Sequence, residues 1–149
     1  MKNASFLRLR TVFFVVLAWG AATLGSAQTA TFTADTTALA PGGGRVALTA
    51  TVTYEQLPGA LGWSIVLPAD WSLLSVSGDP VPGIAPEVGS SGTLEFAYFT
   101  IPAQRAEFKL VVQYPAGATT AKAVPTVLVR ANGKLLTLEP SPVTFGARP

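Results

Sequence analysis

The chain has 149 residues, with 10 basic and 8 acidic side chains, and it contains no cysteine and no histidine. These absences exclude disulfides, zinc sites built from cysteine or histidine, and catalysis through a histidine base or a cysteine nucleophile. Hydrophobic residues make up 49% of the sequence, so packing of apolar side chains has to provide the stability.

Residues 1–27 have the pattern of a secretory signal peptide. Lys2, Arg8 and Arg10 form a positive n-region, residues 12–24 are mostly apolar, and the small residues at 25–27 predict cleavage after Ala27. The apolar stretch is shorter than the roughly 20 residues that span a membrane. We therefore expect a bacterial protein that is secreted or periplasmic, with no membrane insertion after signal cleavage.

The leader also explains the positive charge of the whole chain. Without its three basic residues, 7 basic side chains remain against 8 acidic ones, a net charge of −1. The basic residues are scattered singly, which is not the pattern of a nucleic-acid surface. Residues 28–149 are expected to form a single domain.

Residues 28–149 repeatedly alternate between apolar and polar side chains, as half-buried strands do. Between the expected strands lie segments rich in proline, glycine and serine, the longest at residues 78–92. The expected strands are residues 31–36, 46–55, 61–67, 71–77, 93–100, 107–114, 126–130, 135–139 and 143–145.

Two of these segments predict finer detail. In residues 71–77 the alternation slips at Leu73-Leu74, which predicts a β-bulge or a change of sheet. Near the C-terminus, Asn132-Gly133 is the strongest short signal for a hairpin. A two-residue turn at this point pairs Val129 with Leu136, and Val127 with Leu138.

Eight or nine short strands separated by turns predict an all-β fold, an antiparallel β-sandwich of the jelly-roll or immunoglobulin-like kind. A small closed barrel is the alternative. Either architecture buries one face of each strand and leaves the other face for solvent or a ligand.

The order of the segments resembles the cohesin-type sandwich, a fold shared with some bacterial cellulose-binding modules. The resemblance covers residues 46–138. It consists of the following segments in chain order: the threonine-rich strand at residues 46–55, the strand Leu61-Gly62-Trp63-Ser64-Ile65-Val66-Leu67, the break at residues 68–71, the strand Leu74-Ser75-Val76, the long loop, and the strands at residues 92–98 and 108–114. It implies a jelly-roll-like sandwich and a binding role, and it transfers no functional residue.

Three aromatic residues are the candidate ligand-binding residues. Trp71 follows a turn and is expected to be partly exposed, whereas Trp63 alternates with Leu61 and Ile65 and is expected in the core. Tyr98 and Phe99 are adjacent, so one of them has to face outward, and Phe99 is the candidate. Exposed aromatic rings are the usual stacking surfaces for sugars.

Other chemistry has little support in the sequence. Glu95 and Glu107 are candidates for a hydrolytic carboxylate pair on neighbouring strands, but a solvated face explains Glu107 better, since Lys109 is beside it. The acidic residues are too dispersed for a calcium site. Gly42-Gly43-Gly44 lacks the Lys-Ser/Thr and the helix of a phosphate-binding loop. We expect no catalytic residue, no metal and no cofactor.

The sequence therefore favours an exported, non-catalytic interaction domain that binds a protein partner or serves as an extracellular structural module. A carbohydrate-binding module that stacks polysaccharide on exposed aromatic rings is the alternative. A sugar binder should show two or three coplanar exposed aromatics, whereas a protein binder should show a broad, flat face of mixed polarity. The sequence does not indicate an oligomeric state.

Overall fold

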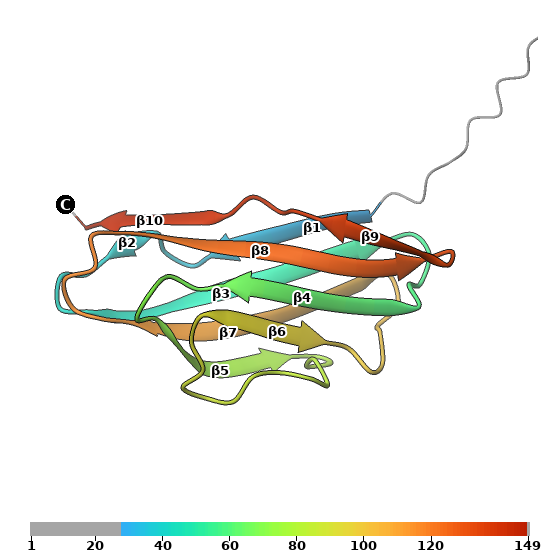
Figure 1. Ribbon diagram of the computed structural model, residues 1–149, viewed down its shortest axis with the longest axis horizontal. Helices are drawn as coiled ribbons and strands as arrows, with labels where there is room; N and C mark the ends of the chain where they lie inside the picture. The colour runs from blue at the N-terminus through green and yellow to red at the C-terminus, as the bar shows by residue number, and fades with distance from the viewer. Residues whose placement is uncertain (1–27, 149) are drawn as a thin grey trace, which may run out of the picture.

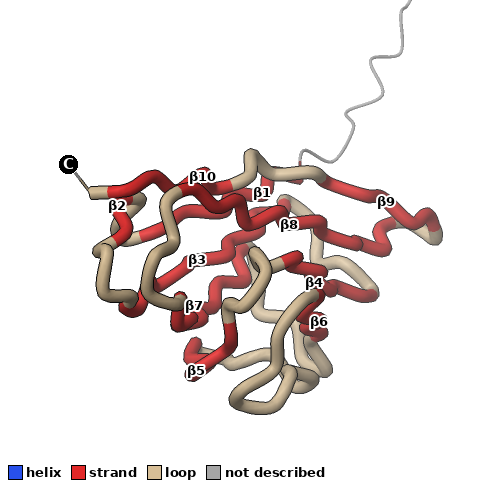
Figure 2. The backbone as a smooth tube through the Cα atoms, turned by 60° about the vertical axis from the view of Figure 1, so that its left-hand side comes forward, coloured by secondary structure: helices blue, strands red, loops and turns tan. Residues whose placement is uncertain are grey.

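A computed structural model describes residues 28–148 of the chain, and the predicted leader lies outside these residues. The described part folds into ten strands without a helix (Figures 1 and 2). The strands are β1 (Gln28–Ala34), β2 (Ala38–Leu39), β3 (Gly44–Tyr54), β4 (Ala60–Val66), β5 (Ser72–Gly78), β6 (Thr93–Ala97), β7 (Arg105–Tyr114), β8 (Thr120–Ala131), β9 (Lys134–Leu138) and β10 (Val143–Ala147).

The strands form two sheets that pack face to face. The first sheet has the order β1-β3-β7-β5, and the second has the order β2-β10-β8-β4-β6, with β9 also paired to β8. All pairs are antiparallel except β10 with β2. Figure 1 looks onto the second sheet, with β8, β4 and β6 in front of β3 and β7. The prediction of an all-β sandwich is confirmed, and both sheets are open, which rules out the closed barrel.

Alternation along each strand builds the core between the sheets. In β3 the predicted inward residues, Val46, Leu48, Ala50, Val52 and Tyr54, are all buried. Aromatic rings from both sheets meet at the centre: the ring of Trp63 lies 6.0 Å from that of Phe108, which lies 4.7 Å from Phe96. Trp63 is buried, as predicted. Among residues 28–148 no charged side chain is buried.

The β8–β9 hairpin has the predicted register. Val127 pairs with Leu138 and Val129 pairs with Leu136. Asn132 has a φ of 51° and the glycine that follows it has a φ of 73°, the left-handed values that a type I′ turn requires. The bulge is also confirmed, because the register of β5 against β7 shifts between Leu73 and Ser75.

Strand β8 is much longer than the segment predicted at residues 126–130. The first half of the strand was not predicted because Pro125 interrupts its pattern. The amide of Tyr98 donates to the carbonyl of Leu61, 3.1 Å away, which fixes the alternation of the ladder across β4. In that alternation the nitrogen of Pro125 faces the edge of β8 that β9 and β10 share. The chain between those strands, residues 139–142, leaves the ladder at this point, so the missing N–H needs no partner.

The long loop at residues 79–92 covers both sheet edges on one side of the sandwich. Along β5, the amide of Leu73 donates to the carbonyl of Ser90, and the amide of Gly89 donates to the carbonyl of Leu73. Along β6, Ile84 and Ala97 exchange two main-chain hydrogen bonds of 3.0 Å. This side of the sandwich is therefore closed by the chain itself.

Candidate functional site: the outer face of the second sheet

The prediction that Trp71 is partly exposed is wrong. Only 1% of its surface is accessible, because its ring lies between the two sheets, 4.9 Å from the ring of Phe145 and 5.4 Å from that of Tyr114. The turn at residues 68–70 brings Trp71 inward at the start of β5 instead of leaving it on the rim. The indole has no free face on which a sugar could stack.

Tyr98 and Phe99 point in opposite directions, as predicted. Tyr98 is buried, and burial, reinforced by the charges of Tyr54 and Glu107, raises its pKa to about 12. Phe99 is 77% exposed. Its ring lies over Gly83, where a Cβ atom would come within 2.3 Å of the ring. Phe99 therefore lies on the surface with its ring against Gly83, and its role in binding stays a prediction.

The outward side chains of β6, β4, β8 and β9, together with Ile84 and Phe99, form a broad surface that we call the front face. The register aligns them in rows across the strands, since Ile84 pairs with Ala97, Ala97 with Gly62, Gly62 with Leu128, and Leu128 with Thr137. This row is apolar at four of its five positions.

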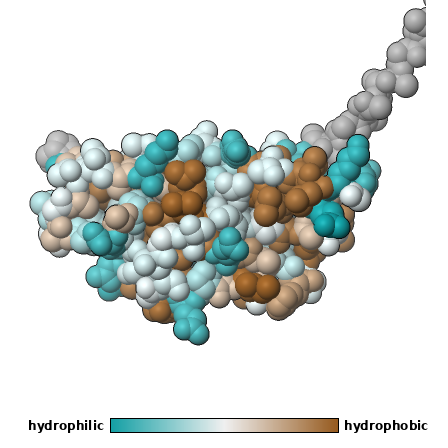
Figure 3. All heavy atoms as spheres, in the orientation of Figure 1, coloured by the Kyte–Doolittle hydropathy of each residue, from teal (hydrophilic) through white to brown (hydrophobic). Residues whose placement is uncertain are grey.

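The neighbouring rows mix apolar and polar side chains. Glu95, Ser64 and Thr126 form one row, and Thr93, Val66 and Val124 form the next. On the other side, Arg130 stands between Ala60 and Leu135. Figure 3 views this face and shows apolar patches over the strands, separated by polar side chains. The front face therefore has mixed polarity.

A shallow apolar groove crosses the front face at Gly62. Its volume is about 250 Å³, with Ile84 and Leu128 on opposite walls, Ala97 in the floor, and Ser64 and Glu95 at one end. The hollow exists because Gly62 has no side chain and Ala97 has a short one, while Ile84 and Leu128 stand up on either side. This groove was not predicted from the sequence, although a glycine at an outward position of a strand is a signal for one.

Glu95 and Glu107 do not form the carboxylate pair that was considered as the less favoured alternative to a solvated face. Glu95 lies on β6 in the second sheet and Glu107 on β7 in the first, so their carboxylates point away from opposite sides of the sandwich. Hydrogen bonds from Arg105 and Thr51 lower the pKa of Glu107. Among residues 28–148, no cluster of three or more acidic side chains has the geometry to hold a metal ion.

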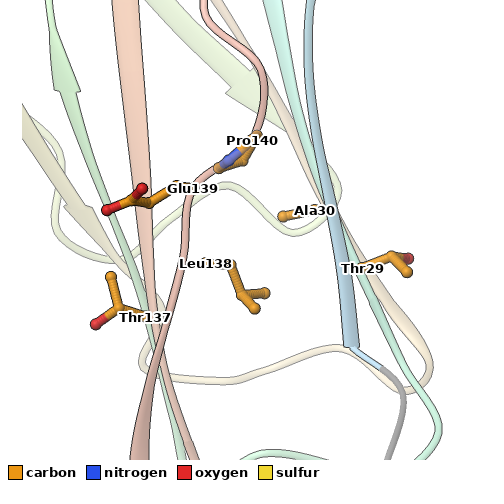
Figure 4. Close-up of a pocket in the computed structure, with 6 residues that line it drawn as sticks. All are labelled: Thr29, Ala30, Thr137, Leu138, Glu139 and Pro140. Atoms are coloured by element: carbon orange, nitrogen blue, oxygen red, sulfur yellow. The ribbon is translucent and has the colours of Figure 1, made fainter.

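A second hollow opens at the side of the sandwich opposite the long loop, between β1 and the end of β9. Its volume is about 350 Å³. Figure 4 shows Leu138 and Ala30 pointing into it from the two sheets, while Thr29, Thr137 and Glu139 point away. On this side residues 35–37 join β1 to β2 at one end of the sandwich, and the hollow at the other end is the open seam between the two sheets.

None of residues 28–148 forms a helix with the length and hydropathy of a membrane span.

No protein-family model matches the sequence, and no curated protein matches it. Among solved structures, the chain is similar to the chitin-binding domain of a hyperthermophilic chitinase from Pyrococcus furiosus, with 16% identity and a TM-score of 0.47 over 73% of this chain and 91% of that one. It is also similar to BslA, a bacterial hydrophobin, with 15% identity and a TM-score of 0.37 over 78% of this chain and 98% of that one. Both TM-scores lie below 0.5, so the description of the fold rests on the strand pairing above, and the cohesin resemblance stays a prediction.

Proposed function

We propose that this protein is an exported, non-catalytic interaction module that binds a protein partner through the front face. The observation that carries the proposal is the composition of that face, which is broad and has an apolar row with a polar row on one side and a row of mixed polarity on the other. Leu128 and Ile84, the walls of the groove, are 43% and 50% exposed. Apolar side chains that gather on one face of a monomer are typical of a recognition surface.

The groove gives the front face a defined place for a partner side chain. Interfaces gain most of their binding energy where one residue fills a desolvated pocket and its neighbours exclude water. Here an apolar side chain would enter between Ile84 and Leu128, over Gly62. Glu95 and Arg130 lie outside the apolar row and would form the polar rim.

A polysaccharide is the second candidate ligand, and the observation that favours it is the exposed ring of Phe99 on the same face. Every other aromatic side chain of residues 28–148 is buried. A single ring can stack on one sugar unit, whereas a chain of sugars needs two or three coplanar rings to be held along its length. The front face therefore supports a protein partner better.

A crosslinking experiment tests the proposal. A photoreactive amino acid at position 128 should capture a partner from the exported fraction, and the same amino acid at position 53, on the outer face of the first sheet, should not. The purified partner should then bind the unmodified protein, and its affinity for Leu128→Glu should be at least tenfold lower, because an apolar side chain that enters the groove would desolvate the new carboxylate. Thr53→Glu is the matched control.

Three outcomes separate the candidates. Capture at position 128 with loss of binding in Leu128→Glu supports the protein partner. Retention on an insoluble polysaccharide that is lost in Phe99→Ala supports the sugar ligand and rejects the protein partner. Binding that neither substitution changes would mean that the front face is not the recognition surface.

A further inference from the structure

Strand β1 has a complete free edge. The amide of Asp35 donates to the carbonyl of Ala47 at 3.0 Å, which sets the alternation of the β1–β3 ladder. Residues 29, 31 and 33 therefore bond to β3, while the amide and carbonyl groups of residues 28, 30, 32 and 34 point away from it. Within residues 28–148, none of these outward groups has a hydrogen-bond partner.

The other long edges of the two sheets are protected against pairing. The loop at residues 79–92 covers β5 and β6. Strand β9 starts with Lys134 and is followed by Pro140 and Pro142, and β2 has two residues. Short edges, lysines and prolines are the usual ways in which proteins prevent edge-to-edge association.

Strand β1 has none of these protections. Its sequence, Gln-Thr-Ala-Thr-Phe-Thr-Ala, contains no charged residue and no proline, and all seven residues pair with β3 without a bulge. It also borders the open seam, where Ala30 faces Leu138 across the hollow. A long, uncharged and regular edge strand is a template for another strand.

We propose that β1 pairs antiparallel with β1 of a second copy of this chain, about a two-fold axis that passes through Thr31. The pattern of the strand is symmetric about this residue. Thr31 would face the partner's Thr31, and Thr29 would face the partner's Thr33, so that threonines meet threonines on the outer surface. On the inner surface, the small Ala30 would face the large Phe32 of the partner subunit.

The backbone geometry is compatible with this register. A two-fold axis perpendicular to the sheet keeps outer side chains on the same surface, so directly opposed residues have to be both odd or both even in number. Pairing Ala30 with the partner's Phe32 satisfies this condition and joins residues whose free amides and carbonyls point to the edge. The threonines then occupy the closer, non-hydrogen-bonded positions, where Cα atoms lie about 4.5 Å apart.

The size of the surface sets the expected affinity. Seven residues make an edge about 24 Å long, and two sheets about 10 Å apart, with their outer side chains, make a side about 20 Å thick. Covering it hides about 500 Å² on each copy, about 1,000 Å² in total, which is below the usual range for stable complexes. We therefore expect a dimer that dissociates in the micromolar range or above.

Disulfide trapping tests the register directly, because the chain contains no cysteine of its own. The protein is secreted with its own leader, purified, and oxidised mildly. Thr31→Cys should give a disulfide-linked dimer, since cysteines at directly opposed positions meet the distance requirement for a disulfide. Thr33→Cys should stay monomeric alone, because in this register its copies lie about 13 Å apart along the strands. A mixture of Thr29→Cys and Thr33→Cys should crosslink.

Sedimentation of the cysteine-free protein provides the second measurement. The average mass should rise from monomer to dimer with concentration, up to several hundred micromolar. Thr31→Lys should remain monomeric, since it would place two lysines opposite each other, and so should Thr31→Glu. An equimolar mixture of these two variants should form a dimer again. Thr51→Lys, on the same surface one strand inward, is the matched control and should dimerise like the parent protein.

The proposal is overturned if the parent protein stays monomeric at all concentrations, or if Thr31→Cys and Thr33→Cys crosslink equally. It is also overturned if Thr51→Lys abolishes the dimer as Thr31→Lys does. Because β1 lies in the first sheet and the front face in the second, Leu128→Glu should leave dimerisation unchanged, so this proposal and the proposed function can fail separately.

Discussion

Replacing Trp71 with alanine should be among the most destabilising single substitutions in this chain. A buried tryptophan removes roughly 150–250 Å² from water, and at about 25 cal/mol per Å² this corresponds to about 4–6 kcal/mol. A compact unfolded state lowers that figure, and tryptophan-to-alanine changes in protein cores cost about 3–5 kcal/mol. We expect Trp71→Ala to lower the free energy of unfolding by about 4 kcal/mol.

The matched variant is Phe99→Ala. With 77% of Phe99 exposed, only about a quarter of its surface is buried, mainly against Gly83, and we expect a loss of about 1 kcal/mol. Urea unfolding followed by far-ultraviolet circular dichroism compares the two variants without depending on tryptophan fluorescence. For a domain of this size, Trp71→Ala should also lower Tm by about 15 °C.

Equal losses of stability in the two variants would contradict the burial of Trp71 between the sheets. So would a loss below about 1.5 kcal/mol in Trp71→Ala, because the indole would then not be packed between Phe145 and Tyr114. In that case Trp71 would again be a candidate for ligand stacking. The expected difference between the variants separates a core residue from a surface residue without knowledge of the ligand.

Tyr98→Phe should be neutral or stabilising by up to about 1 kcal/mol at pH 7, because the Tyr98 hydroxyl is buried without a hydrogen-bond partner. Burial raises the pKa of Tyr98 from its ordinary value of 10.0 to about 12, so the folded state disfavours ionisation of Tyr98 and loses stability as the pH rises from 10 towards 12. Urea unfolding at pH 7 and pH 11 should therefore show a smaller alkaline loss of stability in Tyr98→Phe, and an unchanged loss would contradict this effect. Gly133→Ala should cost about 1 kcal/mol through its φ of 73° alone, since an added Cβ meets nothing within 4 Å, whereas Gly42→Ala, which is equally open, should cost nothing measurable in the same thermal unfolding assay. The exported protein should begin at Gln28, and an intact mass that still contains residues 1–27 would contradict the signal-peptide prediction.

Local patterns were sufficient to predict most of the strands and one pairing. The alternation in residues 46–55 identified the buried face of β3, and Asn132-Gly133 determined the register of the β8–β9 hairpin. These features depend on residues close together in the chain. The two-residue β2 carries too little pattern to be recognised, and Pro125 concealed the first half of β8 because a proline inside a strand normally indicates an edge or a break.

Features that depend on three-dimensional arrangement were not predictable in this way. Glu95 and Glu107 follow one another along the sequence in successive strands, yet the chain crosses between sheets at residues 98–104. Trp71 stands directly after a turn, and nothing in its neighbours shows that Phe145, near the other end of the chain, covers it. The groove at Gly62 depends on Ile84, which belongs to a loop and reaches the sheet through a single bridge.

The order of strands in the sheets has a consequence for how the chain folds. Strand β4 lies between β6 and β8, and Trp63 pairs with Val127, while Ala50 on β3 pairs with Phe108 on β7. Strands β3 and β4 therefore cannot pair with β7 and β8 until those later parts of the chain have been synthesised. Domains dominated by such distant pairings fold in milliseconds to seconds, far more slowly than helical bundles. A newly made chain of this topology remains unfolded for longer, which would suit the proposed export of the chain across a membrane before its core forms.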